Sequence, residues 1–364
     1  MKFKIVRSKF LEGLKSVQGI VASKGSLPVL QNVMLDAKDG ALTLTTTDLD
    51  ISIVSSMPCD VIVPGTSTIP VKLLFNAISK VVEGDVEVET DESDRATICA
   101  GNAKFKFAGL PGADFPKPPV DEDAFTYKIQ QATFKDMLRK VAYAASQDDT
   151  RRTLKGVLMS FKEQKLTMVA TDGRRLALVE QEIEFPQDAE QDIILPSKAV
   201  SELQRTLNGE GELEMIIQKS QICFKVESLM IYTKLIDEIY PNYRQVIPVD
   251  ERQEILVDRQ LLLDALDRVR VLSMEEAHST KLIFSSGKLT VSSAASDIGE
   301  AKDEVPIKYA GDEIEILFDP AYVMDCLKAI DDDEVSINLA DGHAPAIIKC
   351  SIPFIYVLMP LRIG

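Results

Sequence analysis

The sequence predicts an α+β protein built from three tandem copies of one domain, each combining antiparallel strands with paired helices. Three recurring patterns predict it: a strand that ends at an aspartate, an amphipathic helix before that strand, and a second helix that begins near a proline. The order helix, strand pair, helix, strands differs from the strict alternation that builds a parallel sheet. A chain of 364 residues is long enough for two or three domains.

The repeated strand alternates apolar and polar residues, as a half-buried strand does. Its copies occupy residues 42–48, 166–172 and 289–297, and their first leucines are 124 and 123 residues apart. Each copy ends at an aspartate: Asp48, Asp172 and Asp297. We expect these aspartates to form the turn into the next strand. A shared metal site is less favoured, because equivalent positions of separate repeats lie at three different places.

A helical pattern precedes each strand, with apolar residues at positions i, i+4 and i+7 on one face. The three sets are Phe10, Leu14 and Val17; Phe134, Leu138 and Val141; and Leu262, Leu266 and Val269. A second helix begins after Pro70, after Pro196 and at Pro320, since proline suits the first helical turn. The predicted helices cover residues 8–22, 71–82, 133–145, 197–207, 260–272 and 320–330.

Apolar strands close each copy, and polar segments that contain proline separate the copies. These segments are residues 111–123 and 241–253. Such composition is typical of domain boundaries. The predicted domains are therefore residues 1–120, 125–245 and 250–364.

Charge is unevenly distributed along the chain. The net charge is −16, yet the six predicted helices together carry +6 and the remaining residues −22. Solvated helix faces that tolerate lysine would account for this difference. The alternative is one basic surface, suited to the backbone of a polyanion, within an acidic shell that discourages non-specific binding. The negative net charge by itself argues against a nucleic-acid binder.

Signatures of catalysis are scarce. The sequence has no phosphate-binding loop, dinucleotide-binding glycine pattern, serine-nucleophile elbow or zinc-protease helix motif. His278 and His343 have no obvious shared partner, so we interpret both as ordinary residues. Ser285 and Lys288 match a serine–lysine pattern whose serine must begin a helix, whereas Gly287 predicts a hairpin turn there. We expect no enzyme, no cofactor and no metal site.

Cellular location is predicted from what the sequence lacks. The longest stretch without a charged residue is 350–361, only 12 residues, whereas a membrane-spanning helix needs about 20. The N-terminus does not resemble a secretory signal. Five cysteines without a paired pattern argue against a disulfide framework or a zinc cage. We expect a cytoplasmic protein with reduced core thiols and no membrane contact.

Three segments leave a functional and a structural interpretation open. Residues 171–176 place Gly173 and two arginines after an apolar strand, which predicts either a plain hairpin turn or a binding site. Residues 240–244 and 357–364 are apolar and carry proline and arginine. They could form a pocket for a partner peptide or belong to the core.

In these features the chain resembles the bacterial DNA polymerase III beta subunits, the sliding clamps, along its whole length. The resemblance lies in the threefold repeat and in residues 110–116, 169–177, 240–244 and 359–362. It implies a six-domain ring formed by a head-to-tail homodimer, with helices lining the hole and sheets forming the rim. Topology would then retain the DNA, so individual phosphate contacts can stay weak. The acidic net charge no longer argues against DNA binding.

The resemblance also implies a set of residues that touch DNA from the inner surface. They are Lys24, Lys72, Arg139, Lys140, Gln147, Arg151, Arg152 and Lys198. A cleft for short peptides that end in leucine and phenylalanine is implied between the second and third domains. It maps onto Leu154, Thr171, Gly173, Arg175, Leu176, Pro241, Val246, Val357, Leu358, Met359, Pro360, Leu361 and Arg362. An apolar groove with arginines at its edge suits such a ligand.

The implied dimer interface joins the first domain to the third domain of the second subunit. Phe105 and Phe107, on an edge strand, would face Val271 and Leu272 at a helix end. Pairing of sheet edges would bury these side chains.

The function implied is that of a non-catalytic processivity factor, cytoplasmic and associated with the nucleoid. It would slide on double-stranded DNA without sequence preference and tether the replicative polymerase, translesion polymerases and repair proteins, and an ATP-dependent clamp loader would open it. One alternative is an enzyme with its site at residues 171–176, in which Arg175→Ala should abolish turnover. Another is a peptide-binding structural repeat scaffold that does not encircle DNA, which should tolerate charge reversal at Lys24 and Lys198.

Overall fold

The computed structural model describes residues 1–364 except 22–26, 119–123, 251, 272–278, 296–298 and 362–364. It forms two compact units, one of residues 1–132 with 201–235 and the other of residues 133–200 with 236–364. Strands of the middle repeat belong to both units. For this reason the compact units do not coincide with the three repeats, and the predicted domain limits remain predictions.

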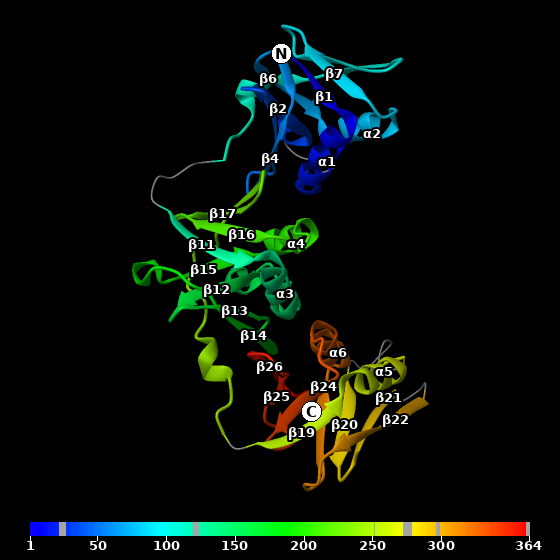
Figure 1. Cartoon of the computed structure of the whole chain (residues 1–364). Coiled ribbons are helices and arrows are strands. Elements are labelled where there is room, and N and C mark those ends of the chain that lie inside the picture. The colour runs from blue at the N-terminus through cyan, green and yellow to red at the C-terminus, as the bar shows by residue number, and fades with distance from the viewer. Residues whose placement is uncertain (22–26, 119–123, 251, 272–278, 296–298, 362–364) are drawn as a thin grey trace. The chain divides into compact units, whose positions relative to one another are not determined.

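Two antiparallel sheets build the first unit (Figure 1). The smaller, in the order β5-β1-β7-β8-β9, contains β1 (Lys2–Val6), β5 (Asp60–Val63), β7 (Asp85–Thr90), β8 (Arg95–Ala100) and β9 (Ala103–Ala108). The larger has the order β10-β6-β2-β3-β4-β18-β17-β16-β11. It contains β2 (Asn32–Lys38), β3 (Ala41–Thr47), β4 (Ile51–Pro58), β6 (Gly65–Pro70), β10 (Leu110–Pro111), β11 (Phe125–Gln130), β16 (Glu212–Ile217), β17 (Gln221–Val226) and β18 (Leu229–Lys234).

One sheet builds the second unit, in the order β15-β12-β13-β14-β26-β25-β24-β19-β22-β21-β20-β23. From the middle repeat it takes β12 (Gly156–Lys162), β13 (Lys165–Thr171), β14 (Arg175–Glu182) and β15 (Gln191–Pro196). From the third it takes β19 (Gln253–Asp258), β20 (Thr280–Ser285), β21 (Lys288–Ala295), β22 (Gly299–Lys308), β23 (Ile314–Phe318), β24 (Glu334–Leu339), β25 (Ala346–Lys349) and β26 (Phe354–Leu358). The two repeats join where β14 pairs antiparallel with β26.

A helix is present in each of the six predicted ranges, but the first ends at Val17 rather than at residue 22 and the third at Val141 rather than at residue 145, where short 3-10 turns follow. The helices are α1 (Arg7–Val17), α2 (Val71–Lys80), α3 (Gln131–Val141), α4 (Ser197–Thr206), α5 (Arg259–Val269) and α6 (Pro320–Ala329). Figure 1 shows α1 beside α2 and α5 beside α6, and both pairs are in contact. Each apolar face predicted from the i, i+4, i+7 pattern is buried, including Phe10, Phe134 and Leu262. Burial of this stripe holds the helices against the sheets.

Side-chain capping explains where two of these helices begin. The Asp258 carboxylate accepts the backbone N–H of Leu261 at the start of α5, at 2.8 Å. The Asp319 carboxylate accepts the N–H of Ala321 at 2.9 Å, and Pro320 supplies the first residue of α6. Such caps satisfy backbone donors that have no partner within the helix.

The turn role of the repeated aspartates is confirmed for two of the three copies. One carboxylate oxygen of Asp48 accepts the N–H groups of Asp50 and Ile51, and one of Asp172 accepts those of Arg174 and Arg175. Asp297 lies outside the described residues. The predicted hairpin at Gly287 is also confirmed: its φ of +72° is left-handed, and it separates β20 from β21.

The other structural predictions have mixed outcomes. Cys223 and Cys326 are buried free thiols, as predicted, whereas Cys59, Cys99 and Cys350 are only partly buried. His343 lies exposed, and His278 falls outside the described residues. Within the described ranges, no helix is long and apolar enough to cross a membrane.

Candidate functional site

The first candidate site is a small apolar cleft in the second unit, where β14 pairs with β26. Its cavity of about 50 Å³ is lined by Thr171, Gly173, Arg174, Arg175, Leu176, Val246, Val357 and Met359. Seven of these eight belong to the predicted peptide cleft, and Arg174 is an addition. This volume is well below the roughly 300–1,000 Å³ of pockets that enclose a small molecule. A ligand could therefore place only a side chain in the cavity, and the rest of it would remain outside.

The floor of the cleft is also part of the core. Leu176 and Val357 are directly opposite each other in the β14–β26 ladder and belong to one buried cluster. Tyr240 and Tyr243 pack against this cluster from the segment after the middle repeat. Val357 and Leu358 are buried and Tyr240 and Tyr243 pack against the core, as the structural interpretation expects, whereas Met359 is 40% exposed at the rim. The pocket for a partner peptide stays a prediction.

The remaining cleft predictions differ in exposure. Leu154 and Pro360 are partly buried, Pro241 and Leu361 are exposed, and Arg362 lies outside the described residues. Leu358 is only 1% exposed and points into the core, because neighbouring residues of a strand face opposite sides of the sheet. The structure does not place its side chain on the cleft lining.

The turn before β14 is held rigidly by its own hydrogen bonds. The Thr171 hydroxyl donates to the carbonyl of Arg175 at 2.6 Å and accepts the N–H of Gly173 at 3.1 Å. Gly173 has a φ of +87°, a conformation that glycine adopts without the strain of a side chain. The Arg151 guanidinium donates to the carbonyl of Asp172 at 3.0 Å. The cleft edge is therefore preformed.

The Arg175 side chain does not point to solvent. Only 9% of it is exposed, although Arg175 is one of the residues that line the cleft. Its Nε donates to Asp172 at 3.1 Å, and its two terminal nitrogens donate to the Asp325 carboxylate and to the carbonyl of Tyr143, both at 2.7 Å. Its guanidinium carbon lies 4.2 Å from the ring centroid of Tyr322. The predicted arginine edge is supplied instead by the exposed Arg174.

Burial dominates the ionisation of the groups around Arg175. Burial raises the pKa of Tyr143 and of Tyr356 well above that of free tyrosine, and it raises the pKa of the Cys326 thiol. Burial opposes the charge of Arg175, but its hydrogen bond and charge interaction with the Asp325 carboxylate raise its pKa above the usual value. Arg175 therefore remains a cation beside neutral tyrosines. Sequence reasoning did not single out Tyr143, Tyr322 or Asp325, since they come from distant parts of the chain.

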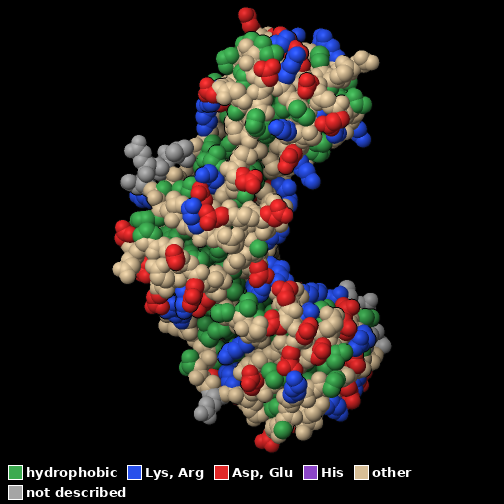
Figure 2. Space-filling model, in the orientation of Figure 1, with side chains coloured by type: hydrophobic (Ala, Val, Ile, Leu, Met, Phe, Trp, Pro, Cys, Tyr) green, Lys and Arg blue, Asp and Glu red, His purple; other side chains and the backbone are tan. Residues whose placement is uncertain are grey.

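The second candidate site is the set of basic residues predicted to touch DNA. Lys72 on α2, Lys198 on α4, and Gln147, Arg151 and Arg152 in the segment after α3 are exposed. Lys24 lies outside the described residues. Figure 2 shows Lys and Arg interspersed with Asp and Glu over the face that it draws, so charge in that view is mixed.

Three of the predicted basic residues form ion pairs with carboxylates: Arg151 pairs with Asp148 at 3.5 Å, and Arg139 and Lys140 share two aspartates. Arg139 forms ion pairs with Asp136, at 2.6 Å, and with Asp331. The Lys140 side chain is only 5% exposed, and its ammonium pairs with the same two carboxylates. The Arg139 guanidinium also holds the pKa of Asp331 below its usual value. Contact of Lys140 with a phosphate would require this ion pair to open.

The third candidate site is the predicted dimer interface. Phe105 and Phe107 lie on β9, at an edge of the smaller sheet. Their rings stack with centroids 6.3 Å apart and planes 6° apart, and both remain partly exposed. Val271 is 66% exposed, whereas Leu272 lies outside the described residues. An edge strand with partly exposed aromatic side chains is available for pairing.

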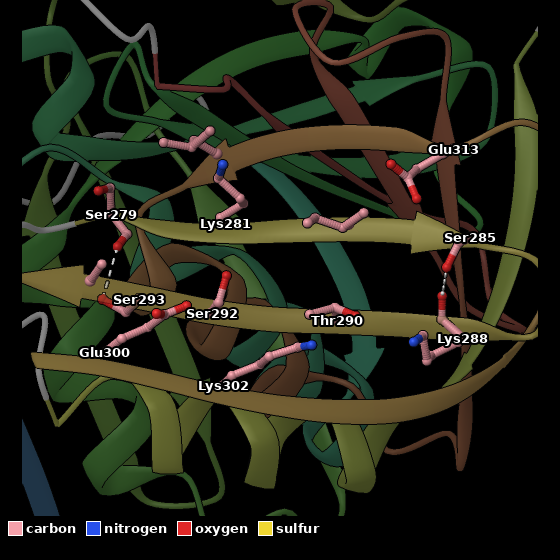
Figure 3. Close-up of a pocket in the computed structure, with 13 residues that line it drawn as sticks. Ser279, Lys281, Ser285, Lys288, Thr290, Ser292, Ser293, Glu300, Lys302 and Glu313 are labelled. Carbon is pink, nitrogen blue, oxygen red and sulfur yellow. Dashed lines mark hydrogen bonds between the residues drawn. The ribbon is translucent and has the colours of Figure 1, made fainter.

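A larger hollow lies elsewhere, on one face of β20, β21, β22 and β23. Its volume is about 550 Å³, and Figure 3 shows Lys281, Lys288 and Lys302 on neighbouring strands there. Lys281 pairs with Glu315 at 2.6 Å, and Lys288 and Lys302 share Glu304 at 3.3 Å and 3.2 Å. Because the lysines are paired with carboxylates, the hollow offers little excess positive charge for an anion.

Comparison with known proteins identifies similarity along the whole chain. Models of the N-terminal, central and C-terminal domains of the DNA polymerase III beta subunit match residues 1–119, 128–242 and 244–362. The chain is 30% identical to the beta sliding clamp of Chlamydia muridarum, over 100% of this chain and 99% of that one. It is 31% identical to the beta sliding clamp of Salmonella typhimurium, over 100% of both chains.

Solved structures agree with these matches. The DNA polymerase III subunit beta of Pseudomonas aeruginosa has a TM-score of 0.96 at 30% identity, and each chain is covered completely. The beta sliding clamp of Caulobacter crescentus, solved with polyethylene glycol at a putative beta-motif tethering region, has a TM-score of 0.93 at 30% identity, over 100% of this chain and 99% of that one. The resemblance and the fold of three tandem clamp domains are therefore confirmed.

Proposed function

This chain belongs to the DNA polymerase III beta subunit family and is a sliding clamp, and from that premise we propose that two copies close head to tail into a ring around duplex DNA. The observation that carries the proposal is the full-length agreement of three consecutive domains with sliding clamps, at a TM-score of 0.96. In such a ring DNA is retained by topology, so the clamp slides and has no sequence preference. It acts in the cytoplasm, at the nucleoid.

We propose that the chain is the non-catalytic subunit that keeps a polymerase on its template. The basic helices support contact with DNA, because the six predicted helical ranges together carry +6 in a chain of net charge −16. Five of the predicted contacts are exposed, and of these Lys72 and Lys198 lie on the basic helices α2 and α4. Arg139 and Lys140 contribute only where phosphates displace their carboxylate partners.

The cleft at β14 and β26 is proposed to bind short peptides of partner proteins. An apolar floor of Leu176 and Val357, with Arg174 exposed beside it, suits a peptide whose apolar side chains enter the groove. The partners are the replicative polymerase, translesion polymerases, repair proteins and the ATP-dependent loader that opens the ring. The interface of the ring places Phe105 and Phe107 of one copy against Val271 and Leu272 of the other.

The test is retention on nicked circular DNA after loading by a bacterial clamp loader with ATP. The salt concentration is set high enough to remove ordinary phosphate contacts, and the DNA is then linearised. A ring stays on the circle and leaves from free ends. If binding disappears in salt whatever the shape of the DNA, despite proven loader activity, the ring is excluded. A peptide-binding scaffold without DNA encirclement would then be the better account, although the full-length match does not favour it.

A further inference from the structure

The contacts of Arg175 connect the cleft to a helix that does not line it. Arg175 belongs to β14 of the middle repeat, whereas Asp325 and Tyr322 belong to α6 of the third repeat. The carboxylate of Asp325 and a terminal nitrogen of Arg175 are 2.7 Å apart. Residues three apart on a helix share a face, so α6 presents the Tyr322 ring and the Asp325 carboxylate together to one guanidinium.

The same guanidinium also connects to the turn that forms the cleft edge. One oxygen of Asp172 accepts the backbone N–H groups of Arg174 and Arg175, while the other accepts Nε of Arg175. Asp172 and Asp325 therefore hold opposite parts of one arginine. A displacement of the guanidinium would be passed to the turn through Asp172.

The ion pair to Asp325 lies in an environment that strengthens it. The Arg175 side chain is 9% exposed and that of Asp325 is 38% exposed, so water screens the pair less than it screens a fully exposed one. Charged hydrogen bonds of this geometry are directional and fix both partners. Loss of Asp325 would leave Arg175 paired with Asp172, so the protein should still fold.

From this geometry we infer that Asp325 is a positioning residue for the peptide cleft: it acts from α6 through Arg175 and sets the place of the turn and the first residues of β14. The inference rests on the proposed peptide-binding function of the cleft. It makes the affinity for a peptide depend on a contact between the middle and third repeats, outside the cleft lining.

The experiment measures fluorescence anisotropy of a fluorescein-labelled synthetic peptide that ends in leucine and phenylalanine. Asp325→Asn should weaken binding by about 3- to 30-fold, the range for residues that act through a packed network, and Asp325→Glu should restore part of the affinity. The control is Asp303→Asn, which removes a third-repeat ion pair to Arg268 of 2.6 Å. This control should bind within about twofold of wild type.

Two further readouts separate positioning from general stabilisation. In the Arg175→Gln background, adding Asp325→Asn should cause no further loss, because the pathway through Arg175 is already absent. Melting temperatures of the Asp325→Asn and Asp303→Asn variants should be similar. The inference would be overturned if Asp325→Asn bound the peptide with wild-type affinity. It would also be overturned if Asp325→Asn weakened binding as much in the Arg175→Gln background as in the wild-type protein. Either result would leave the proposed peptide-binding function of the cleft standing. Failure of the wild-type protein to bind the peptide would overturn the proposed cleft, and this inference with it.

Discussion

Residues of the same charge have very different environments in this protein. Arg174 is exposed, whereas the side chain of the next residue, Arg175, is only 9% exposed and lies between two carboxylates and two aromatic rings. Lys198 is exposed, whereas Lys140 is buried in an ion pair with two aspartates. A residue's contribution to a binding surface therefore depends on the carboxylates near it as well as on its own type.

Gly173→Ala tests the turn at the cleft. The φ of +87° disfavours a side chain, and a Cβ there would lie 3.2 Å from a terminal nitrogen of Arg151. We expect a loss of unfolding free energy of about 1 kcal/mol, together with weaker peptide binding, measured by thermal unfolding and fluorescence anisotropy. Gly287→Ala is the control, since its φ is +72° with nothing within 4 Å: it should lose similar stability and keep the peptide. Equal peptide binding by both variants would contradict a role for the turn.

Asp331 tests the pH dependence of an ion pair. Because Arg139 lowers the pKa of Asp331 in the folded protein, the pair contributes stability above the unfolded pKa near 3.9 and loses it as pH falls further. The Asp331 side chain is 70% exposed, so the contribution is about 0–1 kcal/mol. We expect Asp331→Asn to lower the melting temperature slightly at neutral pH and to match wild type once the pH is well below 3.9. An undiminished difference there would argue against the pair.

Each helix has one face that packs into the core and another that is exposed to solvent. Buried apolar stripes such as Phe134, Leu138 and Val141 pack into the core, while the lysines of α2 and α4 remain exposed. The apolar period predicts the buried face well, because burial of apolar area is the main stabilising term for a surface helix. The apolar period does not predict the charge of the exposed face.

The double variant Lys72→Ala and Lys198→Ala tests the exposed helix face. We expect weaker binding to duplex DNA and a shallower salt dependence, because each lost phosphate contact lowers the slope of log affinity against log salt by about 0.9. The slope is measured by titration at several salt concentrations. Lys162→Ala is the control: Lys162 ends β12 and pairs with Asp192 at 2.6 Å. If the control changed the slope as much as the double variant, the helix face would have no special role.

For the chain as a whole, we expect sheet edges to govern assembly. Strands β4 with β18, and β14 with β26, join successive repeats inside the chain. Strand β9 ends its sheet: one side pairs with β8, and the other side pairs with none of the described strands. An edge of this kind suits pairing with a second copy.

Phe107→Glu tests that assembly. A carboxylate at this edge would be buried without a partner in the proposed dimer, so we expect monomers by light scattering after size-exclusion chromatography, and loss of retention on circular DNA. Phe125→Glu is the control, because Phe125 also lies on an edge strand, β11, and is 43% exposed. It should leave the oligomeric state of the wild type unchanged. Dimers of Phe107→Glu that were as stable as wild type would exclude β9 from the interface.

Local sequence patterns predicted the repeat, the class of fold, the presence of all six helices and the aspartate turns at residues 48 and 172. These features depend on local patterns: the period of apolar residues, helix-starting prolines and side chains that accept nearby backbone donors. The same patterns repeat about every 124 residues, so each copy supports the interpretation of the others. The family resemblance further identified most residues of the cleft lining.

Which charges are exposed, and how the cleft is supported, depends on tertiary packing. Arg175 and Asp325 are 150 residues apart in sequence, and Arg139 and Asp331 are 192 apart. No local pattern predicts such pairs, because their distance is set by the packing of whole elements. Likewise, the two compact units cut across the middle repeat, since hydrogen bonding between strands takes no account of where one repeat ends and the next begins.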